Sequence, residues 1–206
     1  MYIGWNITPG WVWAYFIKSF YNPIASAEPH EGYYALNRLN KEKFTNDSFH
    51  YITMNVDGYH QMAGADEDCV SEVHGTIKRF HCIKCANPII VQAPETTSSC
   101  PPRCEKCGGY PRPACVLFTE ALPSKDWNRA SNAIDMLQDN DVMIIIGTSS
   151  VVYPAASLPS YAKGNGAVLI EVNPDASTPL KNIVDIHLQG TALEILPQLV
   201  SAVLNE

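Results

Sequence analysis

Val142-Met143-Ile144-Ile145-Ile146 is an uninterrupted run of β-branched and aliphatic residues, and Gly147-Thr148-Ser149-Ser150 ends it. Strands that are apolar on both faces are typical of parallel sheets with helices on both sides. Small and hydroxyl-bearing residues after such a strand fit the crevice where open α/β sheets bind ligands. Gly147 allows close backbone approach to a ligand, and Thr148 and Ser149 offer hydroxyls to a phosphate or ribose. This stretch therefore predicts a buried strand with a ligand-binding turn.

The alternation of strand and helix patterns continues on both sides of this stretch. Helices are predicted at 11–20, 31–41, 125–138, 153–163 and 191–203, and strands at 49–53, 114–118, 167–172 and 183–188. Two strands lead into polar groups, at Asn55 and Asp57 and at Asn173. The fold predicted is α/β, with a Rossmann-like, doubly wound parallel sheet.

The overall composition narrows the possible partners. The 206 residues carry a net charge of -7, so no basic field favours nucleic acid. No apolar run approaches the roughly 20 residues that span a bilayer. The first 21 residues carry Lys18 as their sole charge and do not resemble a signal peptide. We therefore expect no nucleic-acid or membrane partner and an intracellular location, with mitochondrion, cytoplasm and nucleus left open.

Four cysteines are arranged as two Cys-x-x-Cys pairs, Cys82 with Cys85 and Cys104 with Cys107. This spacing predicts one structural zinc ion held by four thiolates, with no open position for water. Cys100 is close enough in sequence to compete as a ligand, and four unrelated buried thiols are the alternative. A DNA-binding zinc ribbon is disfavoured because the basic residues are few and scattered.

The cysteine pairs also predict the domain organisation. Residues 77–112 contain both pairs, several prolines and glycines, and few large aliphatic residues. We therefore expect a zinc-binding lobe at 77–112, inserted into a main domain made of 1–76 and 113–206.

Several segments, taken together, resemble the sirtuins, from about residue 50 to the C-terminus. Thr53-Met54-Asn55-Val56-Asp57 is similar to the family's Thr-Gln-Asn-Ile-Asp, and Val73-His74-Gly75 to its catalytic segment. The cysteines occupy the places of its zinc ligands, and Val116-Leu117-Phe118-Thr119-Glu120 resembles its Val-Trp-Phe-Gly-Glu. The segment 147–156 is especially similar to the class III, desuccinylase-like branch.

This resemblance implies an NAD-dependent protein-lysine deacylase, which transfers the acyl group to ADP-ribose and releases nicotinamide. His74 matches the base that acts on a ribose hydroxyl, a task that suits imidazole near neutral pH. Further cofactor contacts are implied for Asn55, Asp57, Gly147, Thr148, Ser149, Asn173 and Ala192. An acyl-lysine peptide is expected to add as a strand at Val116, Phe118, Val151 and Val152.

The sequence also departs from the sirtuin pattern. It contains no Gly-Ala-Gly-Ile/Val-Ser loop and no Phe-Arg segment, so we expect an N-terminally truncated sheet and impaired pyrophosphate binding. Met54, Tyr33 and Thr119 replace the family's Gln, His and Gly. Phe16 and Ser19 replace the Tyr and Arg that read an acidic acyl group, so the acyl specificity is not implied.

Two other hypotheses follow from these departures. The chain could be a catalytically impaired sirtuin that serves as a zinc-containing binding module, or an incomplete gene model of an active deacylase.

Overall fold

The computed structural model describes residues 2–44, 48–91 and 101–204, with the side chains described from residue 4 onward. Cys100, the predicted competing ligand, lies outside these ranges. The chain forms two compact units. Unit 1 comprises Met1–Glu28, Thr53–Tyr59 and His74–Pro123, and unit 2 comprises Pro29–Ile52, His60–Val73 and Ser124–Glu206.

Unit 1 combines a helical hairpin with an antiparallel sheet. Its helices are α1 (Tyr2–Ile7), α2 (Pro9–Phe16), a π-helical turn (Ile17–Tyr21) and α3 (Asn22–Ala25), and its strands are β3 (Gly75–Cys82), β4 (Pro88–Ile89) and β5 (Pro111–Cys115). The strand order is β4-β3-β5, with Gly75 opposite Cys115 and Cys82 opposite Pro111. The core is aromatic, with Trp5, Trp13 and Phe16 packed near Phe80.

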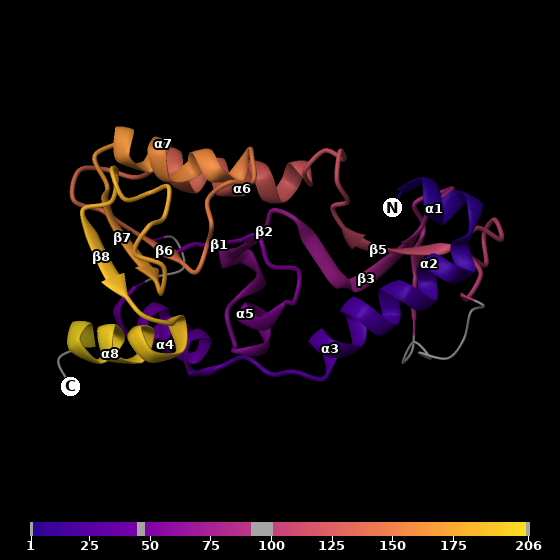
Figure 1. Ribbon diagram of the computed structural model, residues 1–206, viewed down its shortest axis with the longest axis horizontal. Helices are drawn as coiled ribbons and strands as arrows, with labels where there is room; N and C mark the ends of the chain where they lie inside the picture. The colour runs from indigo at the N-terminus through magenta and orange to yellow at the C-terminus, as the bar shows by residue number, and fades with distance from the viewer. Residues whose placement is uncertain (1, 45–47, 92–100, 205–206) are drawn as a thin grey trace. The chain divides into compact units, whose positions relative to one another are not determined.

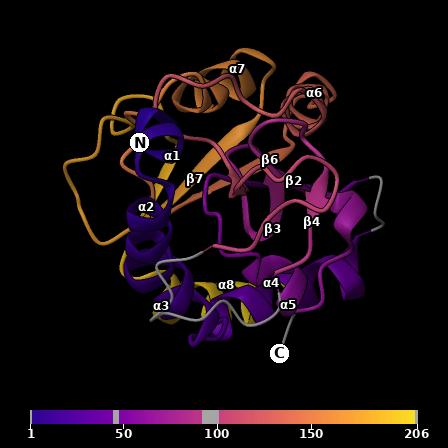
Figure 2. The same ribbon diagram turned by 90° about the vertical axis from the view of Figure 1, so that its right-hand side faces the viewer.

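Unit 2 contains a parallel sheet with the order β6-β7-β8, made of Val142–Ile146, Val168–Asn173 and Ile186–Gln189. Helices α6 (Ser124–Asp135) and α7 (Leu158–Gly164) lie along one face, and α4 (Glu31–Lys43) and α8 (Ala192–Leu204) along the other (Figure 1). The same separation is visible after a 90° turn (Figure 2). The short elements are a 3-10 turn (Glu67–Cys69), β2 (Val70–Glu72) and a second 3-10 turn (Ala155–Ser157). Two more, β1 (Tyr51–Thr53), which pairs with β2, and α5 (Tyr59–Met62), each have one residue in unit 1.

Alternating side chains explain why helices cover both faces of this sheet. Ile145 and Leu169 pack into the cluster formed with α6 and α7. Val172 packs into the opposite cluster, with Leu36 of α4 and Leu196 of α8. The predicted α/β fold with a parallel sheet is confirmed.

Several predicted elements differ in their bounds from the structure. The helix predicted at 153–163 is a 3-10 turn at Ala155–Ser157 followed by α7 from Leu158, and the helix predicted at 125–138 ends at Asp135. The strand predicted at 114–118 is β5, at Pro111–Cys115, because the next residues turn back in a loop closed by a hydrogen bond from Glu120 N to Leu117 O. The strand predicted at 183–188 begins at Ile186, because the amides of Ile183 and Val184 both turn back to Leu180 O.

A further difference lies in the helix predicted at 11–20, which is α-helical to Phe16 and then continues as a π-helical turn in which Phe20 is 42% exposed. A π-helical turn contains more residues than an α-helical turn. The π-helical turn at Ile17–Tyr21 therefore shifts Phe20 away from the buried face of Trp13, Phe16 and Ile17.

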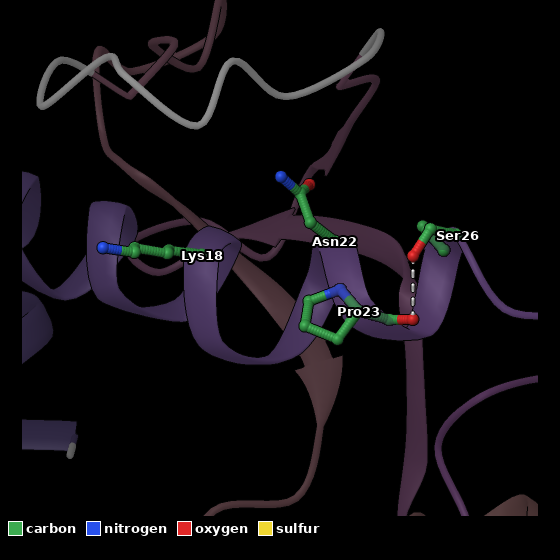
Figure 3. A pocket seen from close by; sticks show the side chains of 5 residues that line it. Lys18, Asn22, Pro23 and Ser26 are labelled. Atoms are coloured by element: carbon green, nitrogen blue, oxygen red, sulfur yellow. Dashed lines mark hydrogen bonds between the residues drawn. The ribbon is translucent and has the colours of Figure 1, made fainter.

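A shallow hollow lies beside this helical segment, lined by Lys18, Asn22, Pro23, Ala25 and Ser26 (Figure 3). Ser26 Oγ donates a hydrogen bond to Pro23 O across 3.1 Å. None of the residues predicted to form the site lines it. Among the described residues, no helix is both long enough and apolar enough to span a membrane.

Candidate metal centre and catalytic segments

The four cysteines converge in unit 1. Their Sγ atoms all lie within 4.8 Å of one another, and three of the separations are 3.4 Å (Cys82 to Cys107), 3.4 Å (Cys85 to Cys107) and 3.7 Å (Cys85 to Cys104). Disulfide sulfurs would be about 2.05 Å apart. Four sulfurs bound to zinc at about 2.3 Å lie about 3.8 Å from one another. The quartet therefore fits one structural zinc ion, and these residues would hold it.

The two cysteine pairs sit on turns of the same construction. Ala86 N donates to Cys82 O and Gly108 N donates to Cys104 O. In each turn the residue after the second cysteine has a positive φ, 54° at Ala86 and 68° at Gly108. A Cβ at Gly109 would lie 2.6 Å from Cys82 Sγ, so this position has no room for a side chain. The main chain thus presets the four sulfurs.

The other described cysteines lie elsewhere. Cys69 is buried in unit 2, and Cys115 is half-buried at the end of β5. Burial raises the pKa of the Cys115 thiol. Neither belongs to the group of metal-ligating side chains found among the described residues.

His74 immediately precedes β3, and its ring is oriented by the main chain. Its Nδ1 lies 3.1 Å from Met54 O. Because a carbonyl oxygen only accepts hydrogen bonds, Nδ1 carries the proton in this contact and Nε2 of the neutral ring keeps its lone pair. His74 can therefore act as a base through Nε2. The partner is the main chain of Met54, so the change from Gln to Met leaves this contact possible.

Asn55 and Asp57 are on the segment that docks against β3 within the same unit. Val56 O accepts from Ile77 N at 3.0 Å, which fixes the segment beside the strand that follows His74. Asp57 Oδ1 accepts from Tyr59 N at 2.9 Å, so this carboxylate caps a turn. Asn55 is exposed. The structure thus brings His74, Asn55 and Asp57 into one unit.

Three of the four predicted peptide-binding residues are exposed, and Val116 is half-buried. Phe118 is 96% exposed in the loop after β5, and Val116 N in the same loop donates to His74 O at 2.9 Å. Val151 and Val152 belong to unit 2 and are 61% and 49% exposed.

The remaining predicted cofactor residues lie in unit 2, at the carboxyl ends of its parallel strands. Gly147 ends β6 with a φ of 58°, and a Cβ there would meet nothing within 4 Å. Asn173 Nδ2 donates to Thr148 O at 3.0 Å, which ties the turn after β6 to the end of β7. Ser149 is exposed, and Ala192 is the first residue of α8. Thr148 Oγ1 accepts from Ser150 N at 3.0 Å.

Two polar networks were not predicted. In unit 2, Glu171 is fully buried, and its Oε2 accepts from Thr178 Oγ1 at 2.8 Å and lies 3.1 Å from His187 Nδ1. In unit 1, Arg112 and Glu120 form a two-pronged ion pair. The sequence signal for the first was a carboxylate inside an apolar strand. For the second it was an Arg and a Glu on either side of the predicted strand 114–118.

Comparison with known proteins identifies the family. The model of the Sir2 family matches residues 7–154. An NAD-dependent protein deacylase of Aquifex aeolicus is 45% identical over 82% of this chain, and the match covers 66% of that protein. The chain thus spans just under two thirds of the length of this relative. NAD-dependent protein deacylase 2 of Pyrobaculum aerophilum is 41% identical over 95% of this chain and 74% of its own length.

Solved structures agree with these relatives. A Sir2 homologue in complex with NAD superposes with a TM-score of 0.85 at 35% identity, covering 98% of this chain and 74% of the other. A Sir2 protein with a p53 peptide and NAD+ gives 0.84 at 26% identity, over 98% and 81%. Because the family model covers most of the chain and these relatives agree in sequence and fold, the chain belongs to the Sir2 family.

Proposed function

We propose that the protein is an NAD-dependent protein-lysine deacylase in which His74 is the base. The observation that carries the proposal is the orientation of His74, whose Nδ1–H is directed to Met54 O and whose Nε2 keeps its lone pair. Nε2 would take the proton from a ribose hydroxyl.

NAD would supply the nicotinamide leaving group and the ADP-ribose that accepts the acyl group. We assign Asn55 and Asp57 to its nicotinamide end, and Gly147, Thr148 and Ser149 to its phosphates or ribose. Asn173 and Ala192 are assigned to its adenosine. Gly147 has open space around it, and the five residues assigned outside the nicotinamide end all lie near the ends of strands. Both observations support these roles.

The zinc ion would act as a structural cross-link and not in the chemistry, because four thiolates leave it no open position. Residues 77–112 would form the zinc lobe, inserted into a catalytic domain of 1–76 and 113–206. Thiolates kept as metal ligands suit a reducing, intracellular compartment.

The substrate would be an acyl-lysine protein or peptide. Solved Sir2 relatives include one with a p53 peptide and one with a propionylated peptide. Val116, Phe118, Val151 and Val152 all lie on irregular backbone, and the last three are exposed, which supports peptide binding at these positions.

The test is nicotinamide release from NAD by the purified protein with an acetyl-lysine peptide and, in parallel, a succinyl-lysine peptide. We expect peptide-dependent release that falls about 10²- to 10⁴-fold in His74→Ala. His50→Ala, which removes a half-buried histidine of unit 2, is the matched control and should retain activity. Equal release by the wild type and His74→Ala would refute the proposal. Peptide binding without any nicotinamide release would favour the catalytically impaired binding module.

A further inference from the structure

The loop that follows β5 is closed by a largely buried ion pair. Arg112 is 7% exposed and lies on β5, and Glu120 ends the loop. Arg112 Nη1 donates to Glu120 Oε1 at 2.5 Å, and Nη2 donates to Oε2 at 2.8 Å. This is the two-pronged arrangement in which a guanidinium and a carboxylate fix each other's position and orientation. The two ends of the loop are thereby held together.

The same two side chains also hold the main chain of the loop. Glu120 Oε2 accepts from Leu117 N at 2.9 Å, and Arg112 Nη2 donates to Cys115 O at 2.9 Å. Within this frame Thr119 adopts a φ of 77°, which a β-branched residue rarely adopts. A loop that contains such a conformation is held by its surroundings and not by its own preference.

The loop after β5 is also hydrogen-bonded to the main chain of His74, the proposed base. Val116 N donates to His74 O at 2.9 Å, and Gly75 pairs with Cys115. Phe118 extends from the same loop with 96% of its surface exposed. Any change in the closure of the loop would therefore shift Val116 and Phe118 relative to His74, all within unit 1.

We propose that Arg112 and Glu120 are positioning residues for the acyl-lysine peptide. They would not touch the peptide, but would hold the loop that carries Val116 and Phe118 in the register that receives it. The inference rests on the proposed function, because it takes this loop as a peptide-binding element. It predicts an effect on peptide binding that is separate from any effect on NAD.

The test is the affinity for a fluorescein-labelled acetyl-lysine peptide, measured by fluorescence anisotropy without NAD. Arg112→Met removes all hydrogen bonds of the guanidinium, whereas Glu120→Gln keeps the shape of the side chain and loses one of the two prongs. We expect the peptide Kd to rise about tenfold or more in Arg112→Met and about threefold or more in Glu120→Gln. Arg112→Lys, which keeps the charge but not the fork, should lie between the wild type and Arg112→Met.

A double variant and a matched control complete the design. Arg112→Met with Glu120→Gln should bind the peptide no more weakly than Arg112→Met alone, because the two residues act as a unit. Arg38→Met and Glu42→Gln make the same changes in an exposed ion pair of unit 2 and should leave the peptide Kd unchanged. In the kinetic assay, KM for the peptide should rise while KM for NAD and kcat stay within about twofold.

Equal peptide Kd in the wild type, Arg112→Met and Glu120→Gln, or no peptide binding by the wild type, would overturn the inference. A merely structural role would lower the melting temperature and the active fraction and leave the Kd of the folded fraction unchanged, which would also overturn it. If Arg112→Met does not fold, Glu120→Gln decides. Peptide binding that depends on Arg112, without nicotinamide release, would refute the proposed function and leave this inference standing.

Discussion

The cysteine turns of unit 1 and the strand ends of unit 2 are both candidate sites, but they are built differently. In unit 1, two pairs of cysteines bring their four Sγ atoms within 4.8 Å of one another, and a backbone turn positions each pair. In unit 2, the turn after β6 and the end of β7 offer open space at Gly147 and an amide at Asn173. The first site is defined by its own ligands, whereas the second depends on backbone geometry and on a ligand that fills it.

This difference has a consequence for stability and for function. A closed constellation contributes its binding energy to folding. An open site at the ends of strands contributes little to the stability of the fold until a ligand binds. Substitutions there should therefore affect ligand affinity more than stability.

The largest expected effect comes from removing one thiolate of the closed site. Cys104→Ala should reduce bound zinc from one ion per chain to a small fraction, because one of the four thiolates is gone. The fold of unit 1 should suffer as well, since structural zinc contributes on the order of 10 kcal/mol to folding. Near-UV dichroism should then lose signal from unit 1, while amide exchange in β6 and β7 stays slow. Cys69→Ala removes a buried thiol of unit 2 and should retain zinc. Full zinc content in Cys104→Ala would contradict the account.

Two glycines next to proposed site residues sharpen the comparison. Gly75 has a φ of 71°, and a Cβ there would lie 2.1 Å from Ala114 O, whereas Gly147 has a φ of 58° and free space. We expect Gly75→Ala to lower the free energy of unfolding by about 3 kcal/mol or more and Gly147→Ala by about 1 kcal/mol. Urea unfolding measures both. Losses of equal size would show that the surroundings of Gly75 and Gly147 are not packed differently.

Acid should weaken unit 2 through His60, whose ring packs between Tyr33 and Tyr51. Burial lowers the pKa of His60 to about 4. Below the pKa of about 6.5 of an unfolded histidine, the unfolded state takes up a proton that the folded state does not. Stability should thus be unaffected above pH 6.5, fall by about 3 kcal/mol between pH 6.5 and 4, and level off below.

His60→Phe is the matched variant for this pH dependence. It keeps an aromatic ring and removes Nδ1, a buried atom that has no hydrogen-bond partner among the residues that the structure describes. In His60→Phe, the fall in the free energy of unfolding between pH 6.5 and 4 should be smaller by about 3 kcal/mol, as measured by urea unfolding. An unchanged slope would show that His60 does not carry the effect.

The smallest expected effect is a gain in stability in the loop of unit 1. Thr119→Gly relieves a φ of 77° at a β-branched residue and should raise the free energy of unfolding by about 1 kcal/mol. Ser150→Gly, at a φ of 50° in unit 2, should gain less, because Ser150 N is already held by Thr148 Oγ1. Destabilisation by Thr119→Gly would mean that its side chain makes a contact worth more than the strain.

Much of the fold could be predicted from patterns within short stretches. The uninterrupted apolar run at 142–146 forms a strand and the segment after Pro29 forms a helix, and both lie where predicted. The strand expected at 114–118 is displaced because Glu120 and Arg112 close the following residues into a loop. That ion pair joins residues on either side of a turn, and a hydropathy pattern carries no signal for it.

The candidate site likewise has parts that could be predicted from the sequence and parts that could not. The cysteine pairs could be predicted because Cys-x-x-Cys spacing directly reflects ligand geometry. The contact between Asn173 and Thr148 and the buried Glu171 network depend on which strands are neighbours, which is a property of the assembled sheet. The hydrogen bond from His74 to Met54 O uses a main-chain carbonyl and is invisible in residue types.

The most direct test of the central claim is the fate of the acyl group. The purified protein, NAD and an acetyl-lysine peptide would be incubated, and the products quantified by mass spectrometry. The account predicts nicotinamide, deacylated peptide and acetylated ADP-ribose in equal amounts, and none of the three above background with His74→Ala. Deacylation without NAD, or equal product from His74→Ala, would contradict it.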